Sequence, residues 1–345
     1  MGRMVFLFFA FLTLLGLRFS QPKSSGRGAG GGSVVERARS VQRTSGGAGT
    51  HDVAIAGDTT TTAHYAATTG THICGNVWGV WTAEGSPYYV DCEIHIPTDS
   101  MLVIEPGCSI IFTGHYKFCV DNNAVLKAIG TPTDSIVFTA QDTVLTDSTG
   151  GHHGIRFYYA AEGCTLMYCR IEYGNAGGGD GGGIYCYYSS PTIMNNTISG
   201  NSAAYDGGGI SCICNSEPII FNSILWQNTA SSGNEIYVSY YESDDTPHPC
   251  TLFIAYTDID PDECCIEGDT AGVIIWGDGN INADPLFADT LFHLSATSPC
   301  INVGAEYVYV SVWDVVIYAP EYDFEGGARP HGTGWDIGAD EYGAQ

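Results

Sequence analysis

A seven-residue phrase occurs twice in the chain, 26 residues apart, and limits the possible folds more than any other feature. It reads DGGGIYC at Asp180–Cys186 and DGGGISC at Asp206–Cys212. Alignment on these glycines gives four segments, which are GIRFY (154–158), GIYCY (183–187), GISCI (209–213) and EIYVS (235–239). A period of this length, with short alternating strands, Gly and Asn turns and no helical pattern, is typical of one coil of a parallel β-solenoid. Leucine-rich repeats and propeller blades need a consensus or a length that the chain lacks.

The alternation within the four segments predicts which side chains point into such a solenoid. Two inward columns are expected. The first consists of Ile155, Ile184, Ile210 and Ile236, and the second, beside the first, consists of Phe157, Cys186, Cys212 and Val238. A second register ends at Ile171, Ile198, Ile224 and Ile259, and this alignment stacks Asn196 on Asn222. Cys186 and Cys212 are expected to pack as reduced thiols, with a disulfide as the alternative. Stacked aliphatic columns bury apolar surface that no single coil could bury alone.

The glycines of the repeated phrase have a structural explanation and a functional one. Asp180 and Asp206, each followed by three glycines, indicate a turn that needs positive φ before the first strand of a coil. A glycine-rich calcium loop is the alternative, although the repeat calcium motif of secreted toxins is not matched. We therefore expect the phrase to shape the coil.

The two ends of the chain differ from its middle in composition. Residues 1–20 contain Arg3 and an unbroken apolar run, which predicts a secretory signal peptide, with an uncleaved N-terminal anchor as the alternative. Residues 21–50 are rich in Gly, Ser and Arg and predict a disordered tether. The expected order is then an N-terminal cap region (51–90), the coils (91–262) and a C-terminal capping segment (263–345). We expect a secreted or cell-surface protein that meets a membrane only through its N-terminus.

Charge and cysteine content exclude some partners. The formal net charge is −26, and seven of the twelve Lys and Arg residues precede residue 51. A body this acidic excludes nucleic acid and anionic lipid as partners held by charge. It either attracts Ca²⁺ or serves solubility. The thirteen cysteines are an odd number, so at least one is free or bonded to another molecule.

Three groups of segments carry a resemblance to a known superfamily. They are PYYVDCEIHIPTDSMLVIEPGCSIIF with GTPTDSIVFTA near the start, the aligned coils, and DPLF, FHLSATSPCINVGA and GARPHGTGWDIGADEYG at the end. The chain resembles the right-handed parallel β-helix superfamily that includes pectate lyases and polygalacturonases, and more closely exported bacterial β-helix proteins of unassigned activity. Its end is similar to the choice-of-anchor segment of bacterial surface proteins. The resemblance implies an all-β, right-handed, single-stranded parallel β-helix.

Candidate catalytic residues are few. A uronate lyase needs a base and acidic groups that hold Ca²⁺. Arg156 and Arg170 are the basic residues of the aligned coils, and Glu172 is the carboxylate beside them. An ion pair is the simpler expectation for such an arginine. The polygalacturonase pattern fails in order and content, and His152 and His153 of GHHG are expected in a turn. The sequence leaves open whether the chain is an enzyme, and it favours a protein without catalytic activity.

Two acidic loops are candidates for Ca²⁺. The first contributes Asp258, Asp260 and Asp262, and the second Asp278, Asn280, Asn282 and Asp284. Oxygen ligands alternate in both, but the first has Glu263 where an EF-hand loop needs glycine. Solvated turns are the alternative for each, so Ca²⁺ is a possible cofactor and no other is indicated.

Outward tyrosines are the main binding candidates. Tyr158, Tyr185, Tyr187 and Tyr237 fall at outward positions of the first strand of successive coils. Tyrosine rings stack on sugar faces while their hydroxyls form hydrogen bonds, although tyrosine is also a common strand residue. We therefore expect binding of polysaccharide or another cell-surface polymer. The alternatives are a lyase or glycoside hydrolase acting on an acidic glycan, and a structural protein that self-associates into fibres.

Overall fold

The structure, a computed structural model, describes residues 70–131, 133–145, 149–240, 248–268, 272–319, 333–340 and 342. The predicted signal peptide and tether, and residues 51–69, lie outside the described residues. The described part is nearly all β-structure in long parallel sheets, which confirms the expected fold class at that level. It contains two short 3-10 helices, η1 (Ala83–Gly85) and η2 (Pro261–Glu263), and no helix in it is long and apolar enough to cross a membrane.

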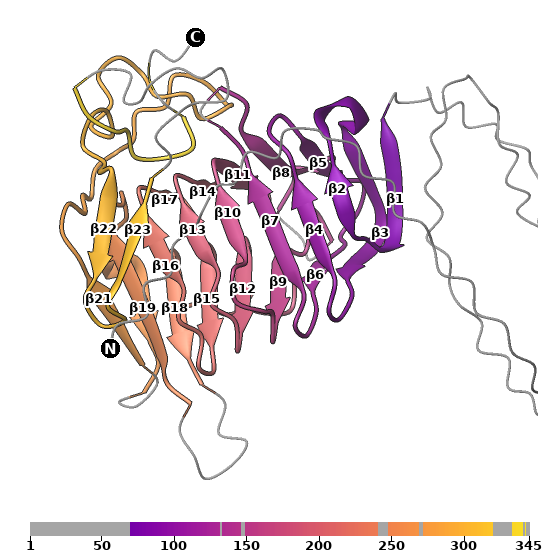
Figure 1. Cartoon of the computed structure of the whole chain (residues 1–345), viewed down its shortest axis with the longest axis horizontal. Coiled ribbons are helices and arrows are strands. Elements are labelled where there is room, and N and C mark those ends of the chain that lie inside the picture. Colours follow the sequence, from indigo (N-terminus) through magenta and orange to yellow (C-terminus); the bar gives the residue numbers. More distant parts are fainter. Residues whose placement is uncertain are drawn as a thin grey trace, which may run out of the picture.

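Twenty-one strands form two parallel sheets in a stack that runs along the long axis of the molecule (Figure 1). The first sheet has 13 strands, which are β1 (Thr71–Asn76), β3 (Tyr88–Ile96), β5 (Ser109–Phe112), β6 (Phe118–Val120), β8 (Ile136–Ala140), β9 (Ile155–Tyr158), β11 (Cys169–Glu172), β12 (Ile184–Tyr187), β14 (Thr197–Ser199), β15 (Ile210–Ile213), β17 (Ile224–Trp226), β18 (Ile236–Ser239) and β20 (Cys264–Ile266). The second has eight strands, which are β2 (Gly79–Trp81), β4 (Met101–Ile104), β7 (Val125–Ile129), β10 (Thr165–Met167), β13 (Thr192–Met194), β16 (Ile219–Phe221), β19 (Cys250–Ala255) and β21 (Gly272–Trp276). The parallel strands thus extend beyond 91–262 at both ends.

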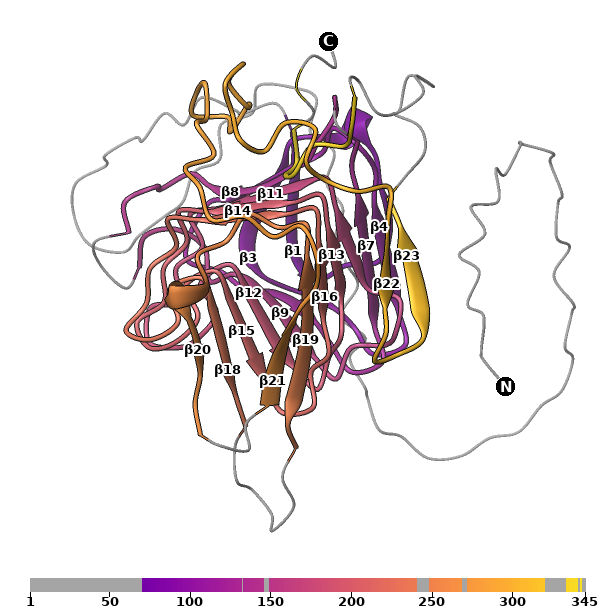
Figure 2. The ribbon, with the colours of Figure 1, turned by 90° about the vertical axis from the view of Figure 1, so that its left-hand side faces the viewer.

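The 13-stranded sheet bends at β3. The first half of β3 pairs with β5, and its second half, Ile94–Ile96, pairs with β6. One wing of the sheet then continues through β8, β11, β14 and β17, and the other, here called the β20 wing, through β9, β12, β15, β18 and β20. Together with the eight-stranded sheet, the two wings surround the core on three sides, as the view along the stack shows (Figure 2).

The predicted inward columns are confirmed. Ile155, Ile184, Ile210 and Ile236 pair in register, and all four are fully buried. The second column, which includes Cys186 and Cys212, is buried in the same core cluster. Both cysteines are free thiols, as expected. Among the described residues there is one disulfide, Cys74–Cys92, so a disulfide is present as expected for an exported chain, although the sequence did not indicate which cysteines pair.

The second register differs from the predicted one by one residue. Ile171 pairs with Ile198 as expected, but Ile198 pairs with Leu225 and not with Ile224. The spacing here is therefore 27 residues, because the corner between β15 and β16 (214–218) is one residue longer than the corner between β12 and β13 (188–191). Asn196 consequently lies beside Ser223, whose hydroxyl accepts its backbone N–H, and the predicted Asn196–Asn222 stack is wrong.

The asparagine ladder lies instead at Asn201 and Asn228. The amide of Asn201 donates to the side-chain oxygen of Asn228 at 2.9 Å and accepts the backbone N–H of Gly174 at 2.8 Å. Both residues are buried. Because these buried amide groups are hydrogen-bonded along the stack, the free-energy cost of burying a polar group without a partner is avoided.

The repeated glycine phrase forms the predicted turn. Gly181 and Gly207, the first glycine of each phrase, have φ of 68°. The second glycine is required for steric reasons, because a Cβ on Gly182 would overlap the carbonyl oxygens of Ser202 and Gly208 in the next coil. Backbone N–H groups of Gly181 and Gly182 donate to carbonyls of the following coil at 2.8 and 3.0 Å. The phrase therefore lets adjacent coils approach closely.

The C-terminal segment packs along the side of the stack. A hairpin of β22 (Tyr307–Val310) and β23 (Val315–Tyr318) places Val308 and Val310 against the outside of the eight-stranded sheet. Ile337 packs with Ile224 on the outside of the wing that ends at β17. Figure 2 shows this segment outside two of the three faces. The candidate site lies on the third face, the outside of the β20 wing.

Candidate functional site

The outside of the β20 wing carries a continuous column of polar and aromatic side chains. Register pairing places it in the order His95, Cys119, Arg156, Tyr185, Ser211, Tyr237 and Cys265. The flanking residues of each strand point into the core, so alternation directs this column outward. Four of these side chains, His95, Cys119, Arg156 and Tyr185, lie in the half of the wing that runs from β3 to β12.

Five tyrosines gather at the ends of β9 and β12, and they are here called the tyrosine cluster: Tyr158, Tyr159, Tyr185, Tyr187 and Tyr188. The rings of Tyr158 and Tyr185 are 5.7 Å apart, and those of Tyr159 and Tyr188 stack at 5.0 Å. Tyr159 is 49 % exposed and the other four are half-buried. The cluster contains three of the four tyrosines singled out in the sequence.

Backbone conformation at the strand ends explains how Tyr159 and Tyr188 join the cluster. Both residues have positive φ, 52° and 47°, at the corner where the chain leaves β9 and β12. The N–H of Tyr159 donates to the carbonyl of Tyr187 in the next coil at 2.9 Å. The sequence analysis missed both residues because strand alternation does not extend into the corner.

Tyr237 belongs to the same outer hydrophobic cluster of buried side chains as Tyr185, Tyr187 and Tyr188, but it lies two strands from Tyr185. It is 4 % exposed, its hydroxyl donates to the carboxylate of Glu267, and Ser211 separates it from Tyr185 in the column. Burial and the bond to Glu267 raise the pKa of Tyr237. Its hydroxyl is thus already committed within the protein.

The pKa of Tyr187 in the cluster is raised to about 12, first by its hydrogen bond with Tyr159 and then by burial. Burial also raises the pKa of Tyr158, although the neighbouring Arg156 opposes the shift. Both hydroxyls are protonated at neutral pH and can donate hydrogen bonds.

Arg156 lies under the cluster and not in solvent. It is 2 % exposed, its Nε donates to the carbonyl of His153 at 2.7 Å, and its guanidinium lies 5.4 Å from the ring centroid of Tyr185. A further N–H donates to the carbonyl of Asp180 in the repeated turn. Burial lowers the pKa of Arg156 to about 10. The side chain thus braces the turn and supports the Tyr185 ring from below.

Arg170 and Glu172 lie on a different face, in β11, so the structure does not bring them together with Arg156. Arg170 Nη2 lies 3.3 Å from Glu172 Oε2. This is the ion pair that the sequence suggested, although both side chains are nearly buried and not on the surface. The guanidinium also lies 5.6 Å from the ring centroid of Phe292 in the C-terminal segment.

His152 and His153 lie in the turn before β9, as expected. His152 Nδ1 accepts the N–H of Gly154, so Nε2 carries the proton and donates to the carbonyl of Glu172 at 3.1 Å. Burial lowers the pKa of His152 to about 3. His153 has a pKa lowered to about 3, by burial and by Arg156. Both imidazoles are neutral at physiological pH.

The seven candidate calcium ligands mostly hold turns together. Asp260 accepts the N–H of Asp262 at the start of η2, and Asp284 accepts the N–H of Leu286. The side chain of Asn280 bonds to the backbone of Thr257 and Ile254. Asp258 is fully buried, and burial raises its pKa to about 6. Asn282 is exposed, and Asp278 supplies a backbone carbonyl to Tyr256.

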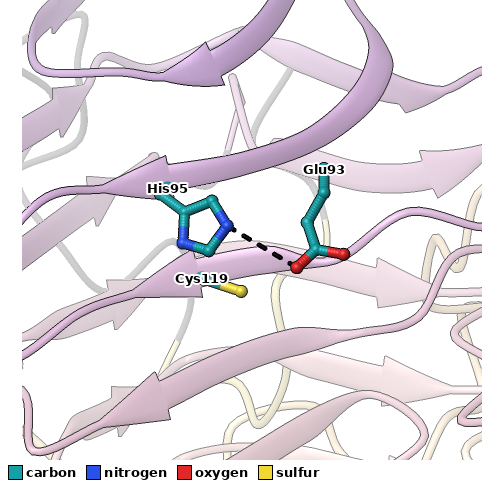
Figure 3. Close-up of side chains that lie close together, drawn as sticks. All are labelled: Glu93, His95 and Cys119. Atoms are coloured by element: carbon teal, nitrogen blue, oxygen red, sulfur yellow. Dashed lines mark ion pairs between the residues drawn. The ribbon is translucent and has the colours of Figure 1, made fainter.

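A different group of metal-binding residue types does come together, at the β3 end of the same face. Among the described residues, Glu93, His95 and Cys119 are the one His, Cys, Asp or Glu group able to hold a metal ion, with ligand atoms within 4.8 Å of one another. Figure 3 shows the imidazole of His95 and the carboxylate of Glu93 facing each other, with the Cys119 sulfur beside them. The sequence analysis missed this group because the register of β3 on β6 carries no repeated phrase; the alternating Glu-Ile-His was the available signal.

Cys119 is a buried thiol, 2 % exposed, beside the carboxylates of Glu93 and Asp121. Burial first, and these two negative charges next, raise its pKa to about 12. The side chain is therefore a neutral thiol at physiological pH when nothing is bound.

Comparison with known proteins gives no relative: no family model, no curated protein and no solved structure matches the chain.

Proposed function

We propose that the protein is a secreted or surface-displayed right-handed parallel β-helix of the pectate-lyase-like kind, which binds polysaccharide through the tyrosine cluster. The stacked order of the strands supports the helix, because successive coils each add one strand to either wing of the 13-stranded sheet and one to the eight-stranded sheet. The disulfide Cys74–Cys92 supports export, since disulfides persist mainly in oxidising compartments.

The observation that carries the binding proposal is the arrangement of the five tyrosine rings. Rings on adjacent coils are separated by centroid distances of 5.0 to 5.7 Å, and one ring is half exposed. Aromatic faces of this kind stack on the apolar faces of sugar rings, and the phenolic hydroxyls donate to sugar oxygens. Because the rings are packed against one another, little side-chain entropy is lost on binding.

Binding is favoured over the lyase alternative by the state of Arg156. Its guanidinium is buried, and backbone carbonyls of His153 and Asp180 accept its hydrogen bonds. A base that removes a proton from substrate must reach that proton within hydrogen-bond distance. Arg156 is instead a positioning residue for Tyr185.

The experiment is a glycan-array screen of the full chain, followed by affinity electrophoresis on each ligand found. We expect Tyr159→Ala and Tyr185→Ala each to weaken binding by about tenfold or more, since an aromatic contact contributes roughly 1–3 kcal/mol on truncation. Tyr307→Ala is the matched control, because Tyr307 is 54 % exposed on the C-terminal hairpin. Unchanged affinity in both cluster variants would remove the cluster from the site.

Product analysis on the same ligands separates binding from catalysis. A binding protein releases no oligosaccharide, whereas a lyase produces an unsaturated end that absorbs ultraviolet light. Product that persists in Arg156→Gln and Arg170→Gln variants would show a hydrolase or lyase site elsewhere.

A further inference from the structure

We propose that Glu93, His95 and Cys119 form a binding site for a divalent transition metal ion of the zinc class. The site is separate from the tyrosine cluster, and the inference does not depend on the proposed function.

Strand geometry places the three ligands together. Glu93 and His95 are two residues apart in β3, so their side chains leave the same face of the strand, while Ile94 between them is buried in the core. Cys119 of β6 is the direct register partner of His95. The backbone therefore fixes the positions from which all three side chains project.

The distances fit a metal ion of this size. Zinc bonds to nitrogen, oxygen and sulfur are about 2.0–2.3 Å long, so tetrahedral ligand atoms lie about 3.5 Å apart. Nε2 of His95 is 3.5 Å from Oε1 of Glu93, and the three ligand atoms lie within 4.8 Å of one another. A shift of Cys119 Sγ by about an ångström closes the site.

Neighbouring charges orient two of the ligands. Nδ1 of His95 is 3.2 Å from each carboxylate oxygen of Asp121, which favours the ring proton on Nδ1 and makes Nε2, on the side of Glu93, the metal-binding nitrogen. A carboxylate behind a histidine is the usual outer support of a zinc ligand. Lys117 Nζ lies 3.8 Å from Oε2 of Glu93, so Oε1 is the oxygen turned toward the imidazole.

The ligand types select the metal. One imidazole, one thiolate and one carboxylate suit zinc and its neighbours, whereas Ca²⁺ and Mg²⁺ prefer oxygen ligands alone. Cys119 loses its proton to solvent as the metal–sulfur bond forms. Three protein ligands leave a fourth position open, and the exposed carboxylate of Glu93 gives that position access to solvent.

Cobalt titration of the metal-free full chain, without reductant and without oxygen, tests the proposal. We expect one Co²⁺ per chain with a thiolate-to-cobalt charge-transfer band and the strong visible absorption of four-coordinate cobalt, displaced by Zn²⁺. Cys119→Ser should abolish the charge-transfer band, and His95→Gln should weaken Co²⁺ binding at least about tenfold. Asp121→Asn should weaken it by about 10- to 100-fold through loss of ligand orientation.

Cys265→Ser is the matched control, because Cys265 is a free thiol at the far end of the same outward column. It should titrate like the wild type. If Cys119→Ser does not fold, His95→Gln decides the question, since the His95 side chain is 36 % exposed and tolerates replacement. Absence of stoichiometric Co²⁺ binding in the wild type, or an unchanged spectrum in Cys119→Ser or His95→Gln, would overturn the proposal.

Discussion

At the residue scale, burial decides the protonation of several groups in the stack. Glu235, at the start of β18, is buried and accepts hydrogen bonds from the side-chain amide and the backbone N–H of Asn228, at 2.6 and 3.3 Å. These bonds favour the carboxylate, but burial outweighs them and raises the pKa of Glu235 from 4.5 to about 7. The group is therefore protonated in the folded protein at pH values where the unfolded chain is ionised.

Glu235 makes the free energy of unfolding depend on pH. Between pH 4.5 and 7 the folded state holds a proton that the unfolded chain has lost, so stability is fully present below pH 4.5 and decreases as pH rises through 7. We expect Glu235→Gln to gain about 3 kcal/mol over the wild type across this range, measured by urea unfolding at several pH values. Glu162→Gln, at an exposed position, is the control. A constant difference between wild type and Glu235→Gln would contradict the account.

The second glycine of the repeated phrase gives another test at this scale. A methyl group on Gly182 would overlap two backbone carbonyl oxygens of the next coil, which cannot move without separating the coils. We expect Gly182→Ala to lower the free energy of unfolding by about 1–3 kcal/mol or more. Gly178→Ala is the matched control in the preceding loop, since no heavy atom lies within 4 Å of its added Cβ. Equal stability of the two variants would exclude close coil contact at this turn.

At the element scale, the sequence predicted the strands that repeat and missed those that do not. The column through Ile155, Ile184, Ile210 and Ile236 was predictable because each strand follows the same glycine phrase and alternates regularly. The asparagine ladder was misplaced because one corner has an extra residue, and a shift of one residue in a strand reverses every side chain. Only contacts between coils reveal that shift.

The candidate sites show the same division between strands that repeat and strands that do not. Tyr158, Tyr185 and Tyr187 lie together because they come from the neighbouring repeated strands β9 and β12, whereas Tyr237 lies two strands further along. The Glu93, His95 and Cys119 group was not predictable, since β3 and β6 share no phrase and 24 residues separate His95 from Cys119. Burial of Arg156 was also missed, because alternation gives the direction of a side chain and not what covers it.

At the scale of the whole molecule, the C-terminal segment covers parts of two faces of the stack, and the third carries the tyrosine cluster and the Glu93, His95 and Cys119 group. Each coil adds one ridge of side chains to that face, about 4.8 Å from the last, which is close to the length of a sugar ring. A polymer lying along the stack would therefore meet a new outward side chain at each coil, with the clustered tyrosines on the coils of β9 and β12. With a formal net charge of −26, the chain repels other polyanions through its electrostatic field.

Hydrogen exchange of the full chain, with and without the oligosaccharide that the array selects, is the measurement that tests the proposed binding face most directly. The account predicts slower amide exchange on binding in the peptides that contain Tyr158–Tyr159 and Tyr185–Tyr188, and unchanged exchange in the β22–β23 hairpin. Protection confined to the hairpin or to the wing that ends at β17 would contradict it.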